Sequence, residues 1–348
     1  MLLVEPEYFE QVRNAGIAIV KALYGRGKTY GFGLNLYHTA RIKRDQEVIY
    51  INAREVRDKI SSLVSIDEYK KIPDLNKLVL TGDALDVIRL VCAGYYLKGI
   101  MNTTDGGVYL ATSTEPLKVV CPNMVKYLSK EPTMGGLREF LRDITKASPR
   151  RLVIAIDEFE QVTVTAAGRP DPQYVYNLIE TLLKSLRPGI LDELPGKFGI
   201  VLLIQELYYP TDRMKELITQ SAYPAIGRMY SVYDDGSIPV RYDINAYIKY
   251  VRDAVTNLVN LKYIDPKIVN NALQAFNDPP NIRKLLKEYL PNMPALIAFN
   301  ILQQLLVTAL SSASVTPDVI KDVFTSLISD YAVYAIYGGR RDVAKAPT

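Results

Sequence analysis

The apolar residues of this chain form short continuous runs up to about residue 240 and helix-spaced stripes beyond it. Runs without alternation, rich in β-branched residues, are typical of strands that are buried on both faces. They predict strands over 16–21, 48–52, 152–156 and 198–204, and shorter ones over 108–110 and 117–120. Because predicted helices separate the longer runs, we expect an α/β fold with a parallel sheet flanked by helices.

Apolar residues at helical spacing predict the helices of this first part, at 30–42, 84–101, 137–146 and 173–186. Gly31 and Gly33 weaken the first of them, by about 1 kcal/mol each. After the last strand the pattern predicts helices only, at 244–259, 266–276, 281–289, 295–311 and 317–337. We therefore expect an α/β domain over 1–240 and an all-helical domain with the C-terminal tail over 241–348.

A glycine-rich stretch directly follows the first predicted strand. Residues 22–29 read ALYGRGKT and fit the phosphate-loop pattern Gly/Ala-x-x-x-x-Gly-Lys-Ser/Thr, which begins here with Ala22. In that pattern, glycines (here Gly25 and Gly27) let backbone N–H groups converge on phosphates at a helix N-terminus. Lys28 would reach the β- and γ-phosphates, and the hydroxyl of Thr29 would help to hold Mg²⁺.

Two neighbours of these residues are included in the predicted nucleotide-binding set. Arg26 lies between the two glycines and adds charge or faces solvent, and Tyr30 directly follows Thr29. A solvated turn with one lysine is the structural alternative for the whole stretch. The preceding strand and the following helix favour the phosphate loop.

The most apolar predicted strand, 152–156, ends in Asp157 and Glu158. At the end of a buried strand, Asp157 is placed to hold Mg²⁺ through water, and Glu158 to polarise the attacking water. A helix start or an exposed turn is the structural alternative. Together with the phosphate loop, this pair predicts a site for ATP and Mg²⁺.

Four stretches of the chain together resemble the AAA+ ATPases, nearest to the archaeal origin-recognition and helicase-loader proteins and the related STAND ATPases. They are ALYGRGKT at 22–29, VIYINAREV at 48–56, RLVIAIDEFEQV at 151–162, and the tail segments 278–283 and 314–319. The resemblance spans most of the chain, and the first and third stretches are its specific parts. It implies that ATP binds between the α/β domain and a helical lid.

The resemblance also implies roles for residues outside the two motifs. Arg283 would be the sensor-two arginine, which reaches the γ-phosphate from the lid. The strand at 198–204 would be the sensor-one strand, so that Gln205 at its end would orient the water. An arginine finger would come from a neighbouring subunit of a homo-oligomer, and Arg228 is favoured over Arg213. The structural alternative for each arginine is an ordinary surface residue.

The chain departs from this family in three respects. The predicted sensor-one strand ends in Gln205, where the family usually has Asn, Thr or Ser, which leaves the rate of hydrolysis open. The spacing from Lys28 to Asp157 is longer than is usual, which predicts an insertion at about 57–135. The residues after the lid-like helices leave no room for the family's C-terminal winged helix, which argues against direct origin binding.

Composition narrows the classes of function. The 42 basic and 38 acidic residues give a net charge of +4, too small to indicate nucleic-acid binding by itself. The basic clusters at 146–151 and 338–345 are interpreted as a solvated loop and tail. The only histidine, His38, is interpreted as structural, and the lack of a CxxC pair argues against a zinc site.

Location is predicted from the same residues. The N-terminus lacks the pattern of a signal peptide, and the apolar stretch 295–309 is shorter than the roughly 20 residues that span a bilayer. Cys92 and Cys121 are expected to be free buried thiols in a reducing compartment. We therefore expect a soluble cytoplasmic protein without a membrane partner. The 25 tyrosines, the absence of tryptophan, and the many Lys, Arg and Glu residues are typical of a thermophile.

These observations favour an ATPase that couples Mg-ATP binding and hydrolysis to a conformational change on a DNA or protein partner. The alternative is a nucleotide-binding scaffold or interaction module with little or no hydrolysis. A kinase-like phosphotransferase would need an acceptor base and a substrate pocket, and the sequence gives no signal for either.

Overall fold

A computed structural model of the chain describes residues 4–69, 74–97, 108–163, 169–186, 190–219, 235–262, 265–267 and 295–312, with the isolated positions 284, 287, 293, 318, 322–323 and 325–326. The chain divides into two compact units. One comprises Tyr8–Tyr24 and Lys28–Val240 and is called the sheet unit below. The other comprises Met1–Glu7, Gly25–Gly27 and Arg241–Thr348 and is called the helical unit.

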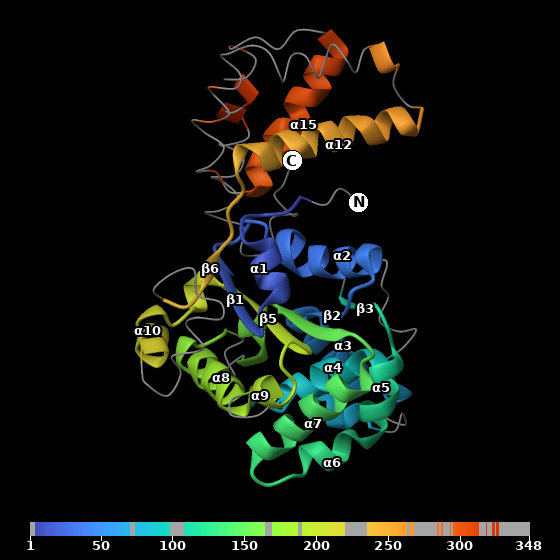
Figure 1. Cartoon of the computed structure of the whole chain (residues 1–348), viewed down its shortest axis with the longest axis vertical. Helices are drawn as coiled ribbons and strands as arrows, with labels where there is room; N and C mark the ends of the chain where they lie inside the picture. Colours follow the sequence, from blue (N-terminus) through green and yellow to red (C-terminus); the bar gives the residue numbers. More distant parts are fainter. Residues whose placement is uncertain are drawn as a thin grey trace. The chain divides into compact units, whose positions relative to one another are not determined.

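The sheet unit is built on six strands in the order β3-β2-β4-β5-β1-β6 (Figure 1). They are β1 (Ile17–Ala22), β2 (Gln46–Asn52), β3 (Tyr109–Ala111), β4 (Arg151–Asp157), β5 (Phe198–Gln205) and β6 (Ile238–Pro239). All neighbours are parallel except β3, which is antiparallel to β2. The four long strands are buried almost throughout, as their unbroken apolar runs predict. The α/β fold is thus confirmed, with one correction, because the sheet is mixed at the β3 edge.

The strand order separates the two strands that carry the sequence motifs. β5 lies between β1 and β4, and Ala22 at the end of β1 is paired with Gln205 at the end of β5. Parallel strands end at the same edge of a sheet, and ligands of open α/β sheets bind beyond that edge. The residues that follow β1, β4 and β5 therefore come together at one place.

Helices cover both faces of the sheet, with α1 and α2 on one side and α7, α8 and α9 on the other in Figure 1. The α-helices of this unit are α1 (Phe9–Asn14), α2 (Asn35–Lys43), α3 (Ala53–Val64), α4 (Asp86–Tyr96), α5 (Glu115–Val120), α6 (Met124–Leu128), α7 (Thr133–Ala147), α8 (Pro172–Ser185), α9 (Leu191–Glu193) and α10 (Thr211–Thr219). The tighter 3₁₀ turns are η3 (Leu75–Leu78), η4 (Cys121–Asn123), η5 (Phe159–Thr163) and η7 (Glu206–Tyr208), and a π-helical segment, η1 (Thr29–Leu34), precedes α2.

One strand prediction is wrong. Residues 117–120 form the end of α5 instead of a strand. Glu115 and Pro116 occupy its first turn, where an acidic residue and a proline both favour a helix start. Leu117 and Val120, three residues apart, then point the same way into the core.

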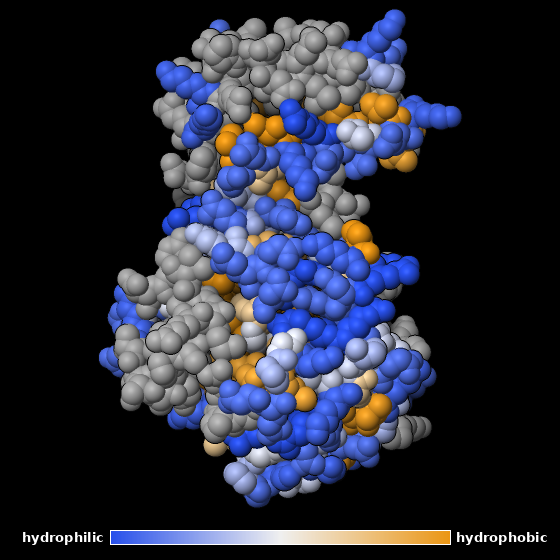
Figure 2. Space-filling model, in the orientation of Figure 1, coloured by the Kyte–Doolittle hydropathy of each residue, from blue (hydrophilic) through white to orange (hydrophobic). Residues whose placement is uncertain are grey.

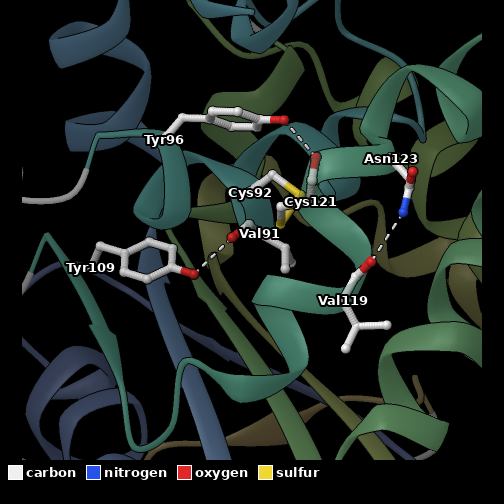
Figure 3. Close-up of a disulfide and its surroundings, with 7 residues drawn as sticks. All are labelled: Val91, Cys92, Tyr96, Tyr109, Val119, Cys121 and Asn123. Carbon is white, nitrogen blue, oxygen red and sulfur yellow. Dashed lines mark hydrogen bonds between the residues drawn. A yellow bond between two sulfur atoms is a disulfide. The ribbon is translucent and has the colours of Figure 1, made fainter.

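The region predicted as an insertion, 57–135, contains most of α3, then α4, β3, α5 and α6, and the start of α7. Its two cysteines are joined. Cys92 on α4 and Cys121 on η4 form a disulfide with their Cα atoms 5.3 Å apart (Figure 3). The expectation of two free thiols is therefore wrong, because the fold brings together two buried sulfurs that are 29 residues apart. Beside them, the Tyr96 hydroxyl donates to the Cys121 carbonyl at 2.6 Å.

In the helical unit, the structure describes α12 (Ile244–Asn260) and α15 (Ala295–Ser312), which confirm the helices predicted at 244–259 and 295–311. Asp243 caps α12 by accepting a hydrogen bond from the Ala246 amide at 2.6 Å. The ring of Phe299 packs against those of Tyr247 and Tyr250. The other three predicted helices, 266–276, 281–289 and 317–337, lie almost entirely outside the described residues.

The visible surface is mostly hydrophilic, and its apolar residues lie in small separate patches (Figure 2). None of the helices over the described ranges is long and apolar enough to cross a membrane.

Candidate nucleotide-binding site

The predicted phosphate loop leaves the end of β1. Gly25 has a φ of 76° and Gly27 a φ of 92°, values that side-chain-bearing residues rarely adopt. These turns explain why glycine stands at both positions of the motif. Within the helical unit, the Leu296 amide donates to the Gly25 carbonyl at 2.9 Å.

The Lys28 ammonium lies over the start of the loop. Its Nζ donates to the Ala22 carbonyl at 2.8 Å and to the Leu23 carbonyl at 3.4 Å. Burial lowers the pKa of Lys28, while the negative charges of Asp157, Glu160, Glu158 and Glu206 act in the opposite direction. The Lys28 ammonium therefore lies over the loop, within electrostatic range of the acidic side chains at the ends of β4 and β5.

The helix after the loop begins as a π-helix, Thr29–Leu34, and continues as α2. Short π-helical stretches are rare and frequently occur at functional sites. Phe32 and Leu34 are buried, whereas Tyr30 has 64% of its surface exposed. A Cβ atom at Gly33 would lie 2.5 Å from Cε2 of Tyr50, so this glycine leaves room for the tyrosine ring.

Asp157, the last residue of β4, is completely buried. Both of its carboxylate oxygens accept hydrogen bonds, Oδ1 from the Glu158 amide and Oδ2 from the Tyr50 hydroxyl, each at 2.9 Å. Burial, with the adjacent negative charge of Asp157, raises the pKa of Tyr50 well above its usual value. The Tyr50 hydroxyl therefore stays protonated at ordinary pH values and donates a hydrogen bond to Asp157.

Glu158 adopts a backbone conformation that is unusual for a residue with a side chain, with a φ of 50°. Such left-handed residues often occur at active sites, where the surrounding structure holds them. Burial and the charge of Asp157 raise the pKa of its carboxyl group, and the charge of Arg54 lowers it. The Arg54 guanidinium lies 4.0 Å from the Glu158 carboxylate.

Glu160 is a further acidic residue of the site that sequence reasoning missed. Only 2% of its surface is exposed, and its Oε2 accepts a hydrogen bond from the backbone N–H of Gln205 at 3.2 Å. Burial raises its pKa to about 7, although the charge of Lys28 acts to lower it. The available signal was an acidic residue between the apolar Phe159 and Val162, directly after the predicted motif.

Gln205 ends β5 at the level of Ala22, the residue from which the loop begins. Its amide is held by Glu160, which follows β4, so the ends of β4 and β5 are tied together beside Lys28. The structure thus brings together five of the predicted or newly found residues: Lys28, Asp157, Glu158, Glu160 and Gln205.

Of the arginines predicted from the resemblance, the structure describes only Arg213, which is engaged away from this cluster. Arg213 on α10 donates to Gln173 and lies over the ring of Tyr176, 5.6 Å from its centroid, so it is engaged with α8. Arg228 and Arg283 lie outside the described residues. Arg26 is partly exposed.

The donor atoms of the cluster suit Mg²⁺, which prefers oxygen ligands and keeps several of its waters. Asp157 offers a carboxylate, and Thr29, the residue after Lys28, carries a hydroxyl at the start of η1. The buried carboxyl group of Glu160 adds to the acidic character of the site. Over the described part of the chain, no group of three or more His, Cys, Asp or Glu side chains could hold a metal ion alone.

Comparison with known proteins adds no assignment: no family model matches this chain, and no curated protein is significantly similar to it.

Proposed function

We propose that this protein binds ATP with Mg²⁺ and hydrolyses it at the cluster formed by Lys28, Asp157 and Glu158. The observation that carries the proposal is the convergence of two motifs about 130 residues apart in the sequence. Lys28 lies in the loop after β1, Asp157 ends β4 and Glu158 follows it, and the charges of this acidic pair act on the lysine. The phosphate-loop pattern and the acidic pair were each ambiguous as sequence motifs.

The chemistry expected of each residue follows from its surroundings. The Lys28 ammonium and the N–H groups of the glycine turns would bind the β- and γ-phosphates. Thr29 and Asp157 would hold Mg²⁺, which when bound neutralises charge on the phosphates. Glu158 would orient the attacking water, and Gln205 would assist from the end of β5. We propose the AAA+ class for this reaction because four sequence stretches resemble that class.

Two substitutions separate binding from hydrolysis. Lys28→Ala should abolish ATP binding, because it removes the ammonium group that would bind the β- and γ-phosphates. Glu158→Gln should retain binding and stop hydrolysis, because the amide keeps the shape but cannot polarise water. Equilibrium binding of ATP and steady-state phosphate release measure the two effects.

Glu115→Gln is a matched control, since Glu115 is an exposed glutamate on α5, outside the cluster. It should leave both binding and turnover unchanged. Normal turnover in the Lys28 and Glu158 variants would rule out hydrolysis at this site. Tightly retained ADP with negligible turnover in the wild type would instead favour a nucleotide-binding scaffold.

The partner is tested by the same turnover assay with and without DNA. Turnover stimulated by DNA would support a loader-like protein that acts on DNA. Turnover indifferent to DNA would support a switch that acts on a protein partner.

A further inference from the structure

The carboxylate of Asp157 is fixed by hydrogen bonds to both of its oxygens. One donor, the Glu158 amide, belongs to the adjacent residue, but the other, the Tyr50 hydroxyl, comes from β2. Asp157 is paired with Asn52 in the sheet, and Tyr50 lies two residues earlier on the same face of β2. The tyrosine therefore reaches Asp157 diagonally across two neighbouring strands.

The place of the Tyr50 ring depends on Gly33. A Cβ atom there would lie 2.5 Å from Cε2 of the ring, a distance that real Cβ atoms essentially never show, and 3.2 Å from Cδ2, which is a tight contact. Gly33 belongs to η1, the segment that begins at Thr29, directly after the phosphate loop. Gly33, one of the two glycines that weaken the helix prediction, is thus the position that leaves room for the Tyr50 ring.

We propose that Tyr50 is a positioning residue for the magnesium site, which holds the Asp157 carboxylate in place, and that Gly33 provides the space for its ring. This inference rests on the proposed function. One hydrogen bond to each carboxylate oxygen leaves lone pairs free for a metal ion or its water. Groups that orient a metal-binding residue in this way typically contribute 10- to 100-fold to metal affinity.

The test is Tyr50→Phe, which removes the hydroxyl and keeps the ring in its buried place. Mn²⁺ serves as the probe, and its binding to the protein with a β,γ-imido analogue of ATP is followed by electron paramagnetic resonance. We expect Mn²⁺ affinity to fall about 10- to 100-fold. Affinity for the analogue in EDTA should not change, because Tyr50 acts on the metal site and not on the phosphate loop.

Tyr109→Phe is the matched control. Tyr109 is also buried, and its hydroxyl donates to the Val91 carbonyl at 2.7 Å, next to the disulfide and not in the cluster (Figure 3). Its variant loses a comparable hydrogen bond and should bind Mn²⁺ as the wild type does. A general loss of stability would affect both variants, whereas a positioning role affects Tyr50→Phe alone.

Gly33→Ala is an independent variant that displaces the ring and keeps the hydroxyl. It should also weaken Mn²⁺ binding, in a protein whose circular dichroism spectrum confirms that it is folded. Wild-type Mn²⁺ affinity in Tyr50→Phe would overturn the inference and leave the proposed function standing. Failure of the wild-type protein to bind the analogue would overturn both.

Discussion

At the scale of single residues, Glu160 is unusual because a carboxyl group is almost completely buried next to other acidic side chains. Burial raises its pKa from 4.5 to about 7. The folded protein therefore binds the Glu160 proton more tightly than the unfolded chain does. Between these two pKa values the folded state carries more of this proton, so this residue's contribution to the free energy of unfolding decreases as the pH rises.

This gives a prediction for Glu160→Gln, whose amide resembles the protonated carboxyl group and can still accept from the Gln205 amide. As the pH rises from 5 to 8, the free energy of unfolding of the variant should increase relative to that of the wild type by about 2.5 kcal/mol, because of the difference between the two pKa values. Urea unfolding at the two pH values measures it, with Glu115→Gln as the exposed control. A difference between variant and wild type that does not change with pH would contradict the prediction.

The same scale shows what the sequence could and could not predict about the site. Lys28 and Asp157 could be proposed from the sequence because their motifs are contiguous in the chain. Tyr50 and Glu160 were not proposed, because their hydrogen bonds, to Asp157 and to the Gln205 backbone amide, join segments far apart in the chain. For Glu160 the sequence offers only its place directly after the predicted motif, and for Tyr50 it offers no local signal. From the sequence, Gly33 is only a residue of low helix propensity, because its contact with the ring of Tyr50 depends on the fold.

At the scale of elements, the four long strands were predicted within two residues at each end, because their apolar runs are long and unbroken. Their order was not predicted. The position of β5 between β1 and β4 depends on pairing between segments far apart in the chain, and hydrophobic patterns are similar in all of them. The short elements around α5 were the least predictable, since a few apolar residues fit a strand or a helix equally well.

The disulfide between α4 and η4 leads to a prediction about stability. It closes a loop of 29 residues, for which the chain-entropy model gives about 3 to 4 kcal/mol. The free energy of unfolding of the wild-type protein, measured in urea, should fall by this amount when a reducing agent is present, and the midpoint should move to lower urea concentration. The double variant C92A/C121A should show no such dependence. An equal response of both proteins to the reducing agent would contradict a stabilising disulfide.

At the scale of the whole molecule, the chain forms two compact units, and the phosphate loop contributes residues to each. Lys28 belongs to the sheet unit, while Gly25–Gly27 cluster with the helical residues. The sequence predicts a change from strands to helices near residue 240, because hydrophobic periodicity differs between the two parts, and beyond that point the structure describes α12 and α15. The grouping of Gly25–Gly27 with residues after 240 could not be predicted, since it depends on contacts such as that of Leu296 with Gly25.

Nucleotide binding should therefore be detectable as a change in the stability of the folded chain. At a concentration of Mg-ATP 100 times its dissociation constant, the stabilisation is about 2.7 kcal/mol. We expect thermal unfolding of Glu158→Gln, which binds without turnover, to move upward by several degrees under these conditions. Lys28→Ala should melt at the same temperature with and without Mg-ATP. Equal shifts in the two variants would place nucleotide binding elsewhere.

The edge strand β3 limits how far this chain can be shortened by engineering. β3 comes from the region predicted as an insertion, yet it completes the sheet: the Thr112 amide donates to the Val48 carbonyl, and the Asn52 amide to the Val108 carbonyl. Removal of the whole region would leave one side of β2 as an open template for intermolecular pairing. Residues 57–135 therefore cannot be removed as one piece without exposing the edge of β2. A shortened version of the protein should retain residues 108–112, which pair with that edge.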